Sequence, residues 1–419
     1  MRNRGMRILL VTRNLPPLVG GMERLNWHMA EELAKVADVR IVGPEGSAAL
    51  APVGIEVREA PLKPLWKFLW RARSLARSEA RRWKPDVVLA GSGLTAPIAR
   101  SAARACGART AVYVHGLDIA VRHPVYRALW LPAIRRADRV IANSSATAGL
   151  CRGIGINPAR IGIVHPGVDL PSGIEEKPCS EVDPAHGPGM TIGANRHSGA
   201  YPQGPSPESS PAGEAEAKQR AFRKRLGIGD GPILLSVGRL SARKGVREFV
   251  TQALPRIITA QPDAMLVVVG DAPNQALHAE VQTPRSIREA AEAAGVANNI
   301  RFLGKVSDVE LLALYGAADV HVFPVREIPG DPEGFGMVAV ESAAQGLPTV
   351  AFATGGVVDA VADGESGCLI TTGDYVAFAD AVAATLVRRD ALRSSCIEFA
   401  GRFNWSGFGA QIAQQLGLV

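Results

Sequence analysis

Residues Met6–Thr12 have the sequence Met-Arg-Ile-Leu-Leu-Val-Thr and are followed, after a short loop, by the segment Glu23–Ala37. The first stretch is a short apolar run, which predicts a buried strand. In the second stretch Leu25, Met29 and Leu33 recur at helical spacing, which predicts an amphipathic helix. A strand followed by a helix that can cover it is the repeating unit of a parallel α/β sheet.

The same alternation continues along both halves of the chain. In the first half, further strands are predicted at Val39–Gly43, Val87–Ala90, Thr110–His115, Arg139–Ala142 and Ile161–His165. In the second half, strands are predicted at Ile233–Gly238, Met265–Gly270, Ile300–Leu303, Val320–Phe323 and Thr349–Ala353. Helical segments fall between the strands, so the sequence predicts two successive doubly wound α/β units, each with a parallel sheet.

Between the two units the composition changes. Residues 172–217 are rich in Pro, Gly, Ser, Glu and Ala and contain few large apolar side chains. Such a segment cannot bury enough apolar surface to offset its ordering entropy, which predicts disorder. We therefore expect a first domain at 1–170, a disordered interdomain insertion at 171–217 and a second domain at 218–398.

Length and cysteine usage suit a two-domain intracellular protein. With 419 residues, the chain is long enough for two domains of ordinary size. Its five cysteines are scattered and form no C-x-x-C pair, which indicates reduced thiols and argues against a disulfide framework or a structural zinc site. The first apolar run, Ile8–Val11, is too short for a signal peptide, so we expect a cytoplasmic location.

The net charge of +7 is unevenly distributed along the chain. Residues 1–170 contain 26 Lys and Arg against 12 Asp and Glu, whereas the remaining residues contain 21 against 28. A basic half is typical of proteins that bind nucleic acid, an anionic membrane or an anionic substrate. No nucleic-acid recognition motif accompanies the charge, so we do not expect nucleic acid as a partner.

One segment of the basic half, Leu65–Trp83, has the periodicity of an amphipathic helix. Its polar side contains the basic residues Lys67, Arg71, Arg77 and Arg81, and Trp66 and Trp70 flank its apolar face. The apolar stripe alone suits a helix that packs on a core and exposes a solvated basic face. Cations together with tryptophan suit an anionic membrane surface, so we expect residues 63–83 to make peripheral contact with the inner face of the plasma membrane.

The segment Glu333–Glu341 contains two carboxylates around a glycine-rich loop. Gly334 and Gly336 allow the backbone to approach a ligand closely. A helix predicted at Met337–Gln345 would direct its free N–H groups toward the same place, which favours phosphate. Two acids beside an anion-binding loop suit an elongated anionic ligand with hydroxyl groups at both ends, such as a sugar nucleotide.

Other polar residues follow predicted strands, where ligands bind in open α/β sheets. Arg239 follows the strand Ile233–Gly238, and Lys244 lies five residues further on, so the two cations could clamp a diphosphate, although solvated surface cations would show the same pattern. His115 ends another strand and begins the sequence His-Gly-Leu-Asp. Gly20 and Gly21 lie in the first strand-to-helix loop, where a close approach to an anion is possible.

Residues Gly91–Ala96 match the G-x-G-x-x-A fingerprint of dinucleotide-binding loops. The strand that precedes them lies in the middle of its domain, and no acid follows the next strand to hold a ribose. We interpret this segment as a turn and keep an oxidoreductase as an outside alternative.

These segments together resemble the retaining glycosyltransferases of family 4, also called group 1 transferases. That family has the GT-B fold, in which two Rossmann-like domains face each other across a deep cleft. The resemblance rests on matching motifs at Glu333–Glu341, Gly238–Gly245, Gly20–Gly21, His115–Asp118, His165–Asp169 and Gly355–Gly356. The family lacks the long interdomain insertion found here.

The resemblance also implies roles for matched positions. The diphosphate would be held by Arg239 and Lys244, the ribose by Glu341, and the transferred sugar by Glu333, with His115 facing that sugar near the bond that breaks. The implied catalytic residues are His115, Glu333, Arg239 and Lys244. The implied donor-binding residues are Gly20, Gly21, Arg239, Lys244, Gly304, Val306, Glu333, Gly334, Phe335, Gly336, Met337, Val338 and Glu341.

The implied reaction is transfer of a hexose, of mannose type or of glucose or GlcNAc type, from a nucleoside diphosphate sugar. The acceptor would be a hydroxyl of a lipid-linked or cell-envelope glycan, as in polysaccharide or lipopolysaccharide biosynthesis. The family uses no metal and no cofactor beyond its sugar-nucleotide co-substrate, in agreement with the lack of a D-x-D motif in this sequence. A helix within 399–419 would return to the first domain. A nucleotide-sugar epimerase of the same fold and a non-catalytic sugar-nucleotide-binding protein remain alternatives, and the sequence indicates no oligomeric state.

Overall fold

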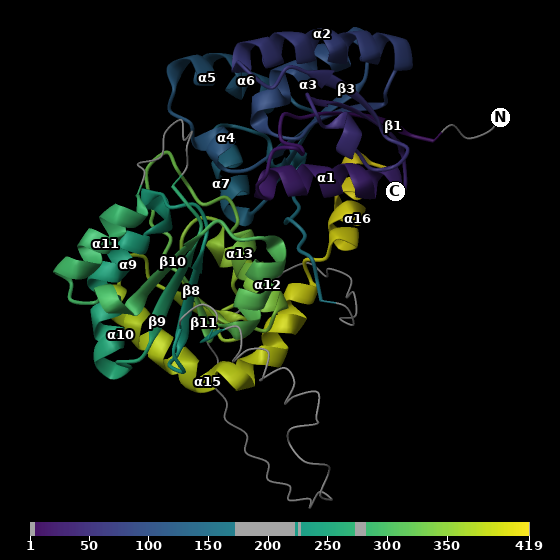
Figure 1. Cartoon of the computed structure of the whole chain (residues 1–419). Coiled ribbons are helices and arrows are strands. Elements are labelled where there is room, and N and C mark those ends of the chain that lie inside the picture. Colours follow the sequence, from purple (N-terminus) through teal and green to yellow (C-terminus); the bar gives the residue numbers. More distant parts are fainter. Residues whose placement is uncertain (1–4, 172–222, 225–227, 273–281, 419) are drawn as a thin grey trace, which may run out of the picture.

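The structure, a computed structural model, describes residues 5–171, 223–224, 228–272 and 282–418. From residue 172 onward, the predicted disordered insertion lies outside the described residues. The described chain forms two α/β domains, one above the other in Figure 1. Each domain is built on one parallel sheet with helices on both faces, as the alternation of apolar runs predicted.

The first domain contains a seven-stranded parallel sheet in the order β3-β2-β1-β4-β5-β6-β7. Its strands are β1 (Arg7–Val11), β2 (Asp38–Pro44), β3 (Glu56–Ala60), β4 (Val87–Ala90), β5 (Arg109–Val114), β6 (Arg139–Ala142) and β7 (Ile161–Ile163). Its helices are α1 (Gly21–Ala34), α2 (Leu65–Trp83), α3 (Ala96–Cys106), α4 (Leu117–Ala120), α5 (Pro124–Leu129), α6 (Leu131–Arg135) and α7 (Ser145–Gly153), with 3₁₀ turns η1 (Ala48–Leu50), η2 (Gly93–Thr95) and η3 (Pro158–Arg160).

The second domain contains a six-stranded parallel sheet in the order β10-β9-β8-β11-β12-β13. Its strands are β8 (Ile233–Val237), β9 (Met265–Val269), β10 (Ile300–Gly304), β11 (Val320–Phe323), β12 (Thr349–Phe352) and β13 (Gly367–Ile370). Its helices are α9 (Val246–Gln252), α10 (Leu254–Ala260), α11 (Pro284–Ala293), α12 (Asp308–Ala317), α13 (Met337–Ala344), α14 (Val357–Ala360) and α15 (Tyr375–Gly401), with 3₁₀ turns η5 (Ala242–Lys244) and η6 (Ala297–Asn299).

In each sheet the strand order reverses beside the first strand of the domain. The reversal lies between β1 and β4 in the first sheet and between β8 and β11 in the second. Loops on either side of such a reversal diverge and leave a crevice at the carboxyl ends of the strands, where open α/β sheets bind ligands. The loop Gly20–Gly21 follows β1, and the loop that contains Glu333 follows β11.

Apolar residues on both faces of each sheet form the cores. In the first domain, α2, α3 and α6 cover one face and α1 covers the other. The segment predicted as an amphipathic helix at Leu65–Trp83 is α2, and Phe68, Ala72, Ala76 and Trp83 lie buried against the sheet. The apolar stripe of α2 is therefore part of the core, as one of the two interpretations of that segment had it.

The chain crosses back to the first domain at its C-terminal end. The long helix α15 ends at Gly401, and α16 (Trp405–Leu416) lies beside α1 in Figure 1. Phe408, Ile412 and Leu416 of α16 share the core cluster of α1 and the first sheet. Burying a side chain of this size stabilises the fold by about 1.5–3 kcal/mol. The returning helix begins at Trp405, since residues 399–401 still belong to α15.

Two strands were not predicted from the sequence. Both lie at the edge of a sheet, β3 in the first and β13 in the second. The sequence of β3 is Glu-Val-Arg-Glu-Ala and includes exposed polar residues, so it lacks the apolar run on which the prediction relied.

Among the described residues, Cys106, Cys151, Cys368 and Cys396 are unpaired.

Candidate active site

The centre of the candidate site is the buried carboxylate of Glu333, in the loop between β11 and α13. Its Oε2 accepts a hydrogen bond from Nζ of Lys244 at 2.8 Å and a second one from the guanidinium of Arg243. Arg243 also pairs with Asp331, with Nε 3.2 Å from Oδ1. The side chains of Glu333, Arg243 and Lys244 are only 11–13% exposed, so these charges interact in a largely water-excluded place.

The cations around Glu333 fix its charge. Burial by itself raises the pKa of the Glu333 carboxyl, but the charges of Lys244, Arg243 and Arg239 lower it to about 2. Burial lowers the pKa of Lys244, and the neighbouring carboxylate offsets only part of that effect. Glu333 is therefore a carboxylate at any neutral pH, and it is a weak base.

Within the described chain, only one of the two oxygens of the Glu333 carboxylate is hydrogen-bonded. Both cations bind Oε2, and the described residues provide no hydrogen-bond partner for Oε1. A carboxylate oxygen accepts hydrogen bonds only, so Oε1 suits a ligand hydroxyl. The ammonium of Lys244 has three N–H groups and also lies 4.5 Å from the centre of the Phe323 ring.

The backbone around Lys244 is fixed by close contacts. Lys244 lies in the 3₁₀ turn η5, and Gly245, with φ +69, immediately precedes the next helix, α9. A β-carbon on Gly245 would lie 2.1 Å from the carbonyl oxygen of Pro324, so only glycine fits there. The N–H of Arg326 donates to the carbonyl of Arg243 at 2.7 Å. The cation-bearing turn is thus anchored to the loop that follows β11.

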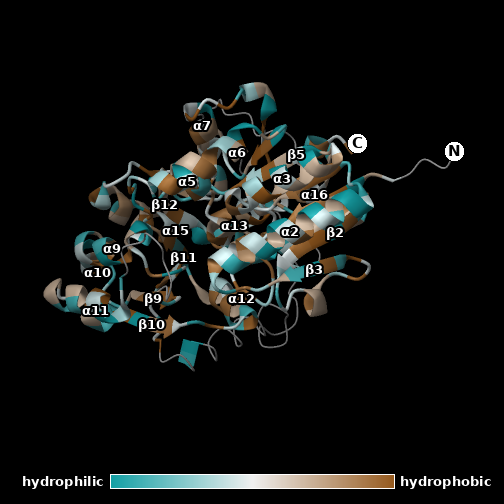
Figure 2. Cartoon of the chain, turned by 90° about the horizontal axis from the view of Figure 1, so that it is seen from above, coloured by the Kyte–Doolittle hydropathy of each residue, from teal (hydrophilic) through white to brown (hydrophobic). Residues whose placement is uncertain are grey.

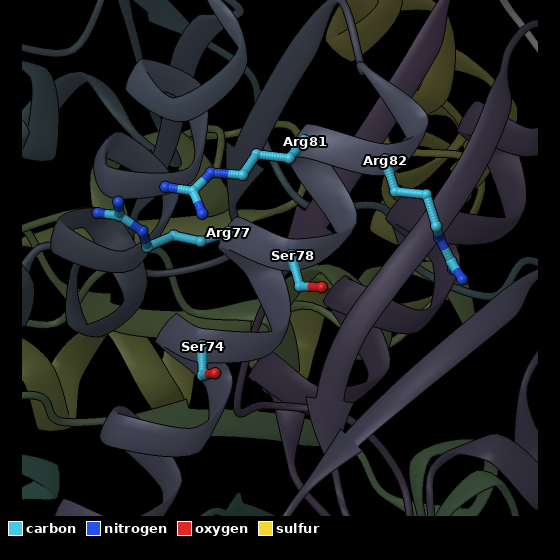
Figure 3. Close-up of a pocket in the computed structure, with 5 residues that line it drawn as sticks. All are labelled: Ser74, Arg77, Ser78, Arg81 and Arg82. Atoms are coloured by element: carbon cyan, nitrogen blue, oxygen red, sulfur yellow. The ribbon is translucent and has the colours of Figure 1, made fainter.

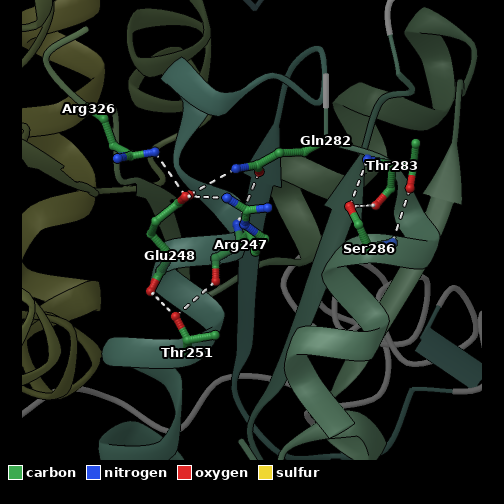
Figure 4. A network of polar contacts seen from close by, with 7 residues as sticks. All are labelled: Arg247, Glu248, Thr251, Gln282, Thr283, Ser286 and Arg326. Atoms are coloured by element: carbon green, nitrogen blue, oxygen red, sulfur yellow. Dashed lines mark hydrogen bonds and ion pairs between the residues drawn. The ribbon is translucent and has the colours of Figure 1, made fainter. Parts of the chain in front are cut away.

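A polar network behind this turn supports the same loop (Figure 4). Oε1 of Glu248 accepts hydrogen bonds from Arg326 at 2.8 Å and from Arg247 at 3.3 Å. Its Oε2 accepts one from Gln282 at 2.9 Å. Glu248 lies in the first turn of α9, where a negative charge also interacts favourably with the helix dipole. The network therefore ties α9 to the loop that contains Arg326 and Glu333.

The paired glycines after β12 support the Glu333 loop from the other side. The N–H of Gly356 donates to the carbonyl of Glu333 at 2.9 Å. A β-carbon on Gly356 would lie 2.1 Å from the carbonyl oxygen of Gly334, and one on Gly355 would lie 2.6 Å from that of Glu333. Side chains at 355 or 356 would therefore displace the backbone that holds Glu333.

In the first domain, His115 follows β5 and its ring is oriented by backbone. Nε2 of His115 lies 3.1 Å from the carbonyl oxygen of Gly91. A carbonyl oxygen only accepts, so Nε2 bears a proton, and no described residue hydrogen-bonds to Nδ1. The N–H of His115 donates to Oδ2 of Asp118 at 3.0 Å, which fixes the His-Gly-Leu-Asp turn.

The two domains touch at the backbone of these loops. A β-carbon on Gly334 would lie 2.6 Å from the carbonyl oxygen of His115, and one on Gly116 would lie 3.5 Å from Cα of Gly334. A β-carbon on Gly21 would lie 3.4 Å from Sδ of Met337. The Glu333 loop therefore lies against the His115 turn, and the first strand-to-helix loop lies against the start of α13.

Asp359 makes a second contact between the domains. Its Oδ2 accepts a hydrogen bond from the N–H of Ser145 at 2.5 Å, and its Oδ1 accepts one from the hydroxyl of Ser145 at 2.6 Å. Ser145 begins α7, so the carboxylate satisfies a free N–H at a helix N-terminus in the other domain. Nearby, the rings of His165 and Phe335 stack with centroids 5.3 Å apart.

Glu341, on α13, lies apart from Glu333 and has its own partners. Its Oε2 accepts a hydrogen bond from the hydroxyl of Tyr315 at 3.3 Å. Its Oε1 pairs with the guanidinium of Arg24, which belongs to α1 of the first domain. The two acids of the Glu333–Glu341 segment therefore bind different cations.

Several buried polar atoms at the carboxyl edge of the first sheet have no hydrogen-bond partner among the described residues. They are Asn26 Oδ1, Ser92 Oγ, Tyr126 Oη and Asn143 Oδ1. Buried polar atoms are normally paired, because leaving one unpaired costs about 1–3 kcal/mol. Asn143 lies next to the Glu333 loop, since a β-carbon on Gly334 would lie 2.9 Å from its Nδ2, but the four unpaired atoms themselves are buried from solvent.

The structure brings most of the predicted site residues together. The cluster of Lys244 and Glu333 meets His115 through Gly334, and Gly21 meets Met337. Arg239 lies exposed just after β8. Phe335 is 3% exposed and packs in a core cluster, so only its backbone can face a ligand.

Three further predicted positions, Gly304, Val306 and Val338, belong to the second domain. Val306 and Val338 pack in one apolar cluster. A β-carbon on Gly304 would meet no atom of the described residues within 4 Å, so a ligand could approach its backbone. The segment Gly91–Ala96 forms a turn, η2 and the start of α3, as interpreted from the sequence. Among the described residues, no three His, Cys, Asp or Glu side chains form a group that could hold a metal ion.

Sequence reasoning missed four residues of the site: Arg24, Arg243, Tyr315 and Asp359. Arg243 is adjacent to Lys244, and the pair of neighbouring cations was a signal that both could face one carboxylate. The other three act on partners that lie far away in the sequence or in the other domain. The motifs in the sequence gave no indication of those contacts.

Comparisons with known proteins identify the family of the chain. The family described as "Glycosyl transferases group 1" matches residues 218–402, and "Glycosyltransferase Family 4" matches residues 19–171. A GDP-mannose-dependent alpha-(1-6)-phosphatidylinositol monomannoside mannosyltransferase of Mycolicibacterium smegmatis is 27% identical over 98% of both chains. A D-inositol 3-phosphate glycosyltransferase of Geodermatophilus obscurus is 33% identical over 65% of this chain, and the match spans 50% of that relative.

Solved structures share the fold. The Anabaena protein Alr3699/HepE in complex with UDP superposes with a TM-score of 0.71 at 20% identity, over 99% of this chain and 100% of that one. WaaG, a glycosyltransferase involved in lipopolysaccharide biosynthesis, gives a TM-score of 0.62 at 17% identity, over 98% and 99% of the two chains. The expected two-domain GT-B fold is therefore confirmed, and the chain belongs to the group 1 glycosyltransferases of family 4.

Proposed function

We propose that this protein transfers a hexosyl group from a nucleoside diphosphate sugar to a hydroxyl of a lipid-linked or cell-envelope glycan, with retention at the anomeric carbon. The observation on which the proposal rests is the contact between the Glu333 loop and the His115 turn. A sugar bound at Glu333 would lie beside His115 and Asn143 of the first domain, which both approach Gly334. An acceptor bound in the first domain would then meet that sugar at the junction.

The charges around Glu333 suit a bound diphosphate. Lys244 keeps N–H groups beyond the one that bonds to Glu333, and Arg239 lies exposed nearby. Arg243 also pairs with Glu333 and balances part of the negative charge of that carboxylate. Lys244 is therefore available to stabilise the charge that develops on the leaving phosphate. The free Oε1 of Glu333 would accept a hydrogen bond from a sugar hydroxyl.

The state of Glu333 also supports a mechanism without a protein nucleophile. A carboxylate whose pKa is about 2 and whose Oε2 binds two cations is a poor base. In the reaction we propose, the acceptor hydroxyl attacks the anomeric carbon from the face that the phosphate leaves. The leaving phosphate takes the acceptor proton. Contact between the domains would exclude water and limit hydrolysis of the donor.

Substitution of Glu341 and Lys244 tests this proposal. We expect Glu341→Ala and Lys244→Ala to abolish donor binding or transfer, and full activity in either variant would contradict the assigned site. Incubation with donor alone separates the alternatives, because an epimerase changes the sugar without an acceptor and a non-catalytic binder leaves the donor intact. The anomeric configuration of the product, measured by NMR, tests retention.

We propose only the chemical class of the donor, a nucleoside diphosphate sugar. A binding measurement identifies which nucleotide it contains. The relative from M. smegmatis is named as GDP-mannose-dependent, and the Anabaena structure holds UDP. We therefore expect one nucleoside diphosphate out of UDP, GDP and ADP, or its sugar, to raise the melting temperature most, since a ligand that binds only the folded state stabilises it. If none of the panel raises it, the donor class is wrong.

We further propose that α2 contacts an anionic membrane at the cytoplasmic face. Figure 2 shows α2 as an outer helix with both hydrophilic and hydrophobic residues. Trp66 and Trp70 are 64% and 71% exposed, which places their rings away from the core. Arg77 and Arg81 are four positions apart, as neighbours on one helix face, where like charges repel unless an anion lies between them.

The basic end of α2 forms a shallow hollow (Figure 3). Its lining consists of two serines and three arginines: Ser74, Arg77, Ser78, Arg81 and Arg82. Arg77 donates to Oγ of Ser101 at 3.0 Å and Arg82 pairs with Glu79 at 2.7 Å. A phosphate group would therefore bind chiefly to Arg81 and to the N–H groups that these two arginines have left. The described chain has no helix that is long and apolar enough to cross a membrane, so the contact we propose is peripheral.

Vesicle binding tests this surface separately from catalysis. We expect sedimentation with phosphatidylglycerol vesicles to fall when Lys67, Arg71, Arg77 and Arg81 are changed together to Glu, and to be weak with neutral phosphatidylcholine. Arg285→Glu, at an exposed position of α11 in the other domain, is the charge control. Unchanged sedimentation of the α2 variant would remove the membrane proposal and leave the transfer proposal intact.

A further inference from the structure

Arg24 of the first domain binds Glu341 of the second, across 317 positions of sequence. The guanidinium pairs with Oε1, while the hydroxyl of Tyr315 donates to Oε2 at 3.3 Å. Both oxygens of the carboxylate therefore have a donor from the protein. Glu341 is also the residue that the proposed function assigns to the ribose hydroxyls. A ribose that binds there must share or replace one of these two donors.

The two protein donors differ in how easily they can move. Tyr315 is 2% exposed and packs in the core between α12 and the second sheet, so it cannot withdraw without a rearrangement of that core. The side chain of Arg24 is 35% exposed, whereas that of Glu341 is only 16% exposed. Arg24 thus covers the carboxylate from the solvent side. To admit a ribose to Oε1, Arg24 is the group that moves.

Arg24 has a second carboxylate within reach. Its Nη1 lies 3.8 Å from Oδ2 of Asp169, in the segment that leads out of the first domain. Asp169 is held in place, because its Oδ1 accepts a hydrogen bond from Nε1 of Trp405 at 2.8 Å. The Trp405 ring in turn stacks on His28 of α1, with centroids 4.1 Å apart. The guanidinium therefore lies between one carboxylate at the nucleotide site and one at the domain junction.

We propose that Arg24 competes with the donor ribose for Glu341 and shifts onto Asp169 when the nucleotide binds. This inference rests on the proposed assignment of Glu341 to the ribose. It makes Arg24 a residue that sets donor affinity from the opposite domain. Asp169 takes part in the same competition. When Arg24 pairs with Asp169, Glu341 is free to bind the ribose.

The competition predicts opposite effects for two substitutions. Removing the cation in Arg24→Ala should strengthen nucleotide binding by about two- to five-fold, the range expected when a partly exposed ion pair no longer has to be broken. Removing the second carboxylate in Asp169→Asn should weaken it, because Arg24 then pairs with Glu341 alone. Asparagine keeps an oxygen for the Trp405 N–H. The double variant should behave like Arg24→Ala.

Isothermal titration with UDP and with GDP measures these effects. The charge control is Lys35→Ala, at the exposed end of the same helix, where Lys35 pairs with Glu32. Arg24→Gln serves as a second neutral variant that keeps hydrogen-bonding capacity, and a thermal melt checks that each variant is folded. We expect tighter binding in both neutral variants, weaker binding in Asp169→Asn, and no change in the control.

The outcomes separate this inference from the function on which it rests. Weaker or unchanged binding in both Arg24 variants would overturn the competition, as would an Asp169→Asn variant that binds as tightly as the wild type. Wild-type protein that binds neither nucleotide would instead contradict the proposed donor. A purely structural role for Arg24 would lower stability without giving opposite changes in affinity.

Discussion

The carbonyl oxygen of His115 faces Gly334 so closely that a β-carbon on Gly334 would lie 2.6 Å from it. One residue follows a strand of the first sheet, and the other belongs to the loop that holds Glu333. The contact is between backbones, so neither side can yield by rotating a side chain. Glycine at this position is therefore a requirement of the closed arrangement of the two domains and of the proposed site between them.

Gly334→Ala should keep each domain folded but prevent this approach. We expect a loss of kcat/KM of at least about ten-fold, because a displacement of the donor loop by a fraction of an ångström misplaces the reacting groups. The melting temperature should change little, since the clash lies between domains. Steady-state kinetics and a thermal melt measure the two effects.

Gly316→Ala is the matched control for this substitution. Gly316 lies in α12, and a β-carbon there would meet no described atom within 4 Å. Alanine in a helix interior stabilises by up to about 1 kcal/mol relative to glycine. We expect full activity in this control. Full activity in Gly334→Ala would show that the closed contact is not used in turnover.

The hydrogen bonds from Ser145 to Asp359 suggest a second test of domain closure. Asp359→Ala removes the acceptor for both the N–H and the hydroxyl of Ser145, and with it the charge at the start of α7. We expect a several-fold rise in KM for the donor and a larger radius of gyration in solution scattering. Asp380→Ala, which removes the exposed partner of Arg256 within the second domain, should change neither.

Local patterns predicted the elements, while long-range contacts completed the site. The limits of α2 followed from apolar residues at helical spacing, and strands buried on both faces followed from continuous apolar runs. Glu333 and Lys244 were found because their loops follow strands of the sheet. The pair of Arg24 and Glu341 spans 317 positions and that of Ser145 and Asp359 spans 214, and such partners depend on how the domains meet.

The unfolding free energy at acid pH should depend on the buried charge of Glu333. Its pKa is lowered from 4.5 to about 2 in the folded protein. A carboxyl with a lower pKa in the folded state adds stability that is fully present above about pH 4.5 and is lost as the pH falls toward 2. Glu333→Gln lacks this contribution. The difference in unfolding free energy between wild type and variant should therefore be largest at neutral pH and shrink below pH 4.5.

Denaturant titrations at a series of pH values measure that difference. Glu365→Gln is a useful comparison, since Glu365 pairs with Arg402 at a more exposed place and should show a smaller difference throughout. A constant difference between wild type and Glu333→Gln from neutral pH down to pH 3 would contradict the lowered pKa of Glu333.

The buried ring of His321 should make the unfolding free energy depend on pH over a higher range than Glu333 does. Its ring is fully buried on β11, with Nδ1 3.1 Å from the hydroxyl of Thr349, and burial followed by the charge of Lys244 lowers its pKa from 6.5 to about 3. Between these values the unfolded chain binds a proton that the folded protein does not. Stability is therefore lost as the pH falls from 6.5 toward 3.

His321→Leu removes this titration and keeps an apolar residue of similar volume. Relative to the wild type, the variant should lose less unfolding free energy when the pH is lowered from 7 to 5, a range that lies above the pH of about 4.5 below which the Glu333 contribution is lost. Denaturant titrations at these two pH values test the prediction. Equal losses in both proteins would mean that His321 takes up its proton at the same pH in the folded and unfolded states, which would contradict the lowered pKa of this buried ring.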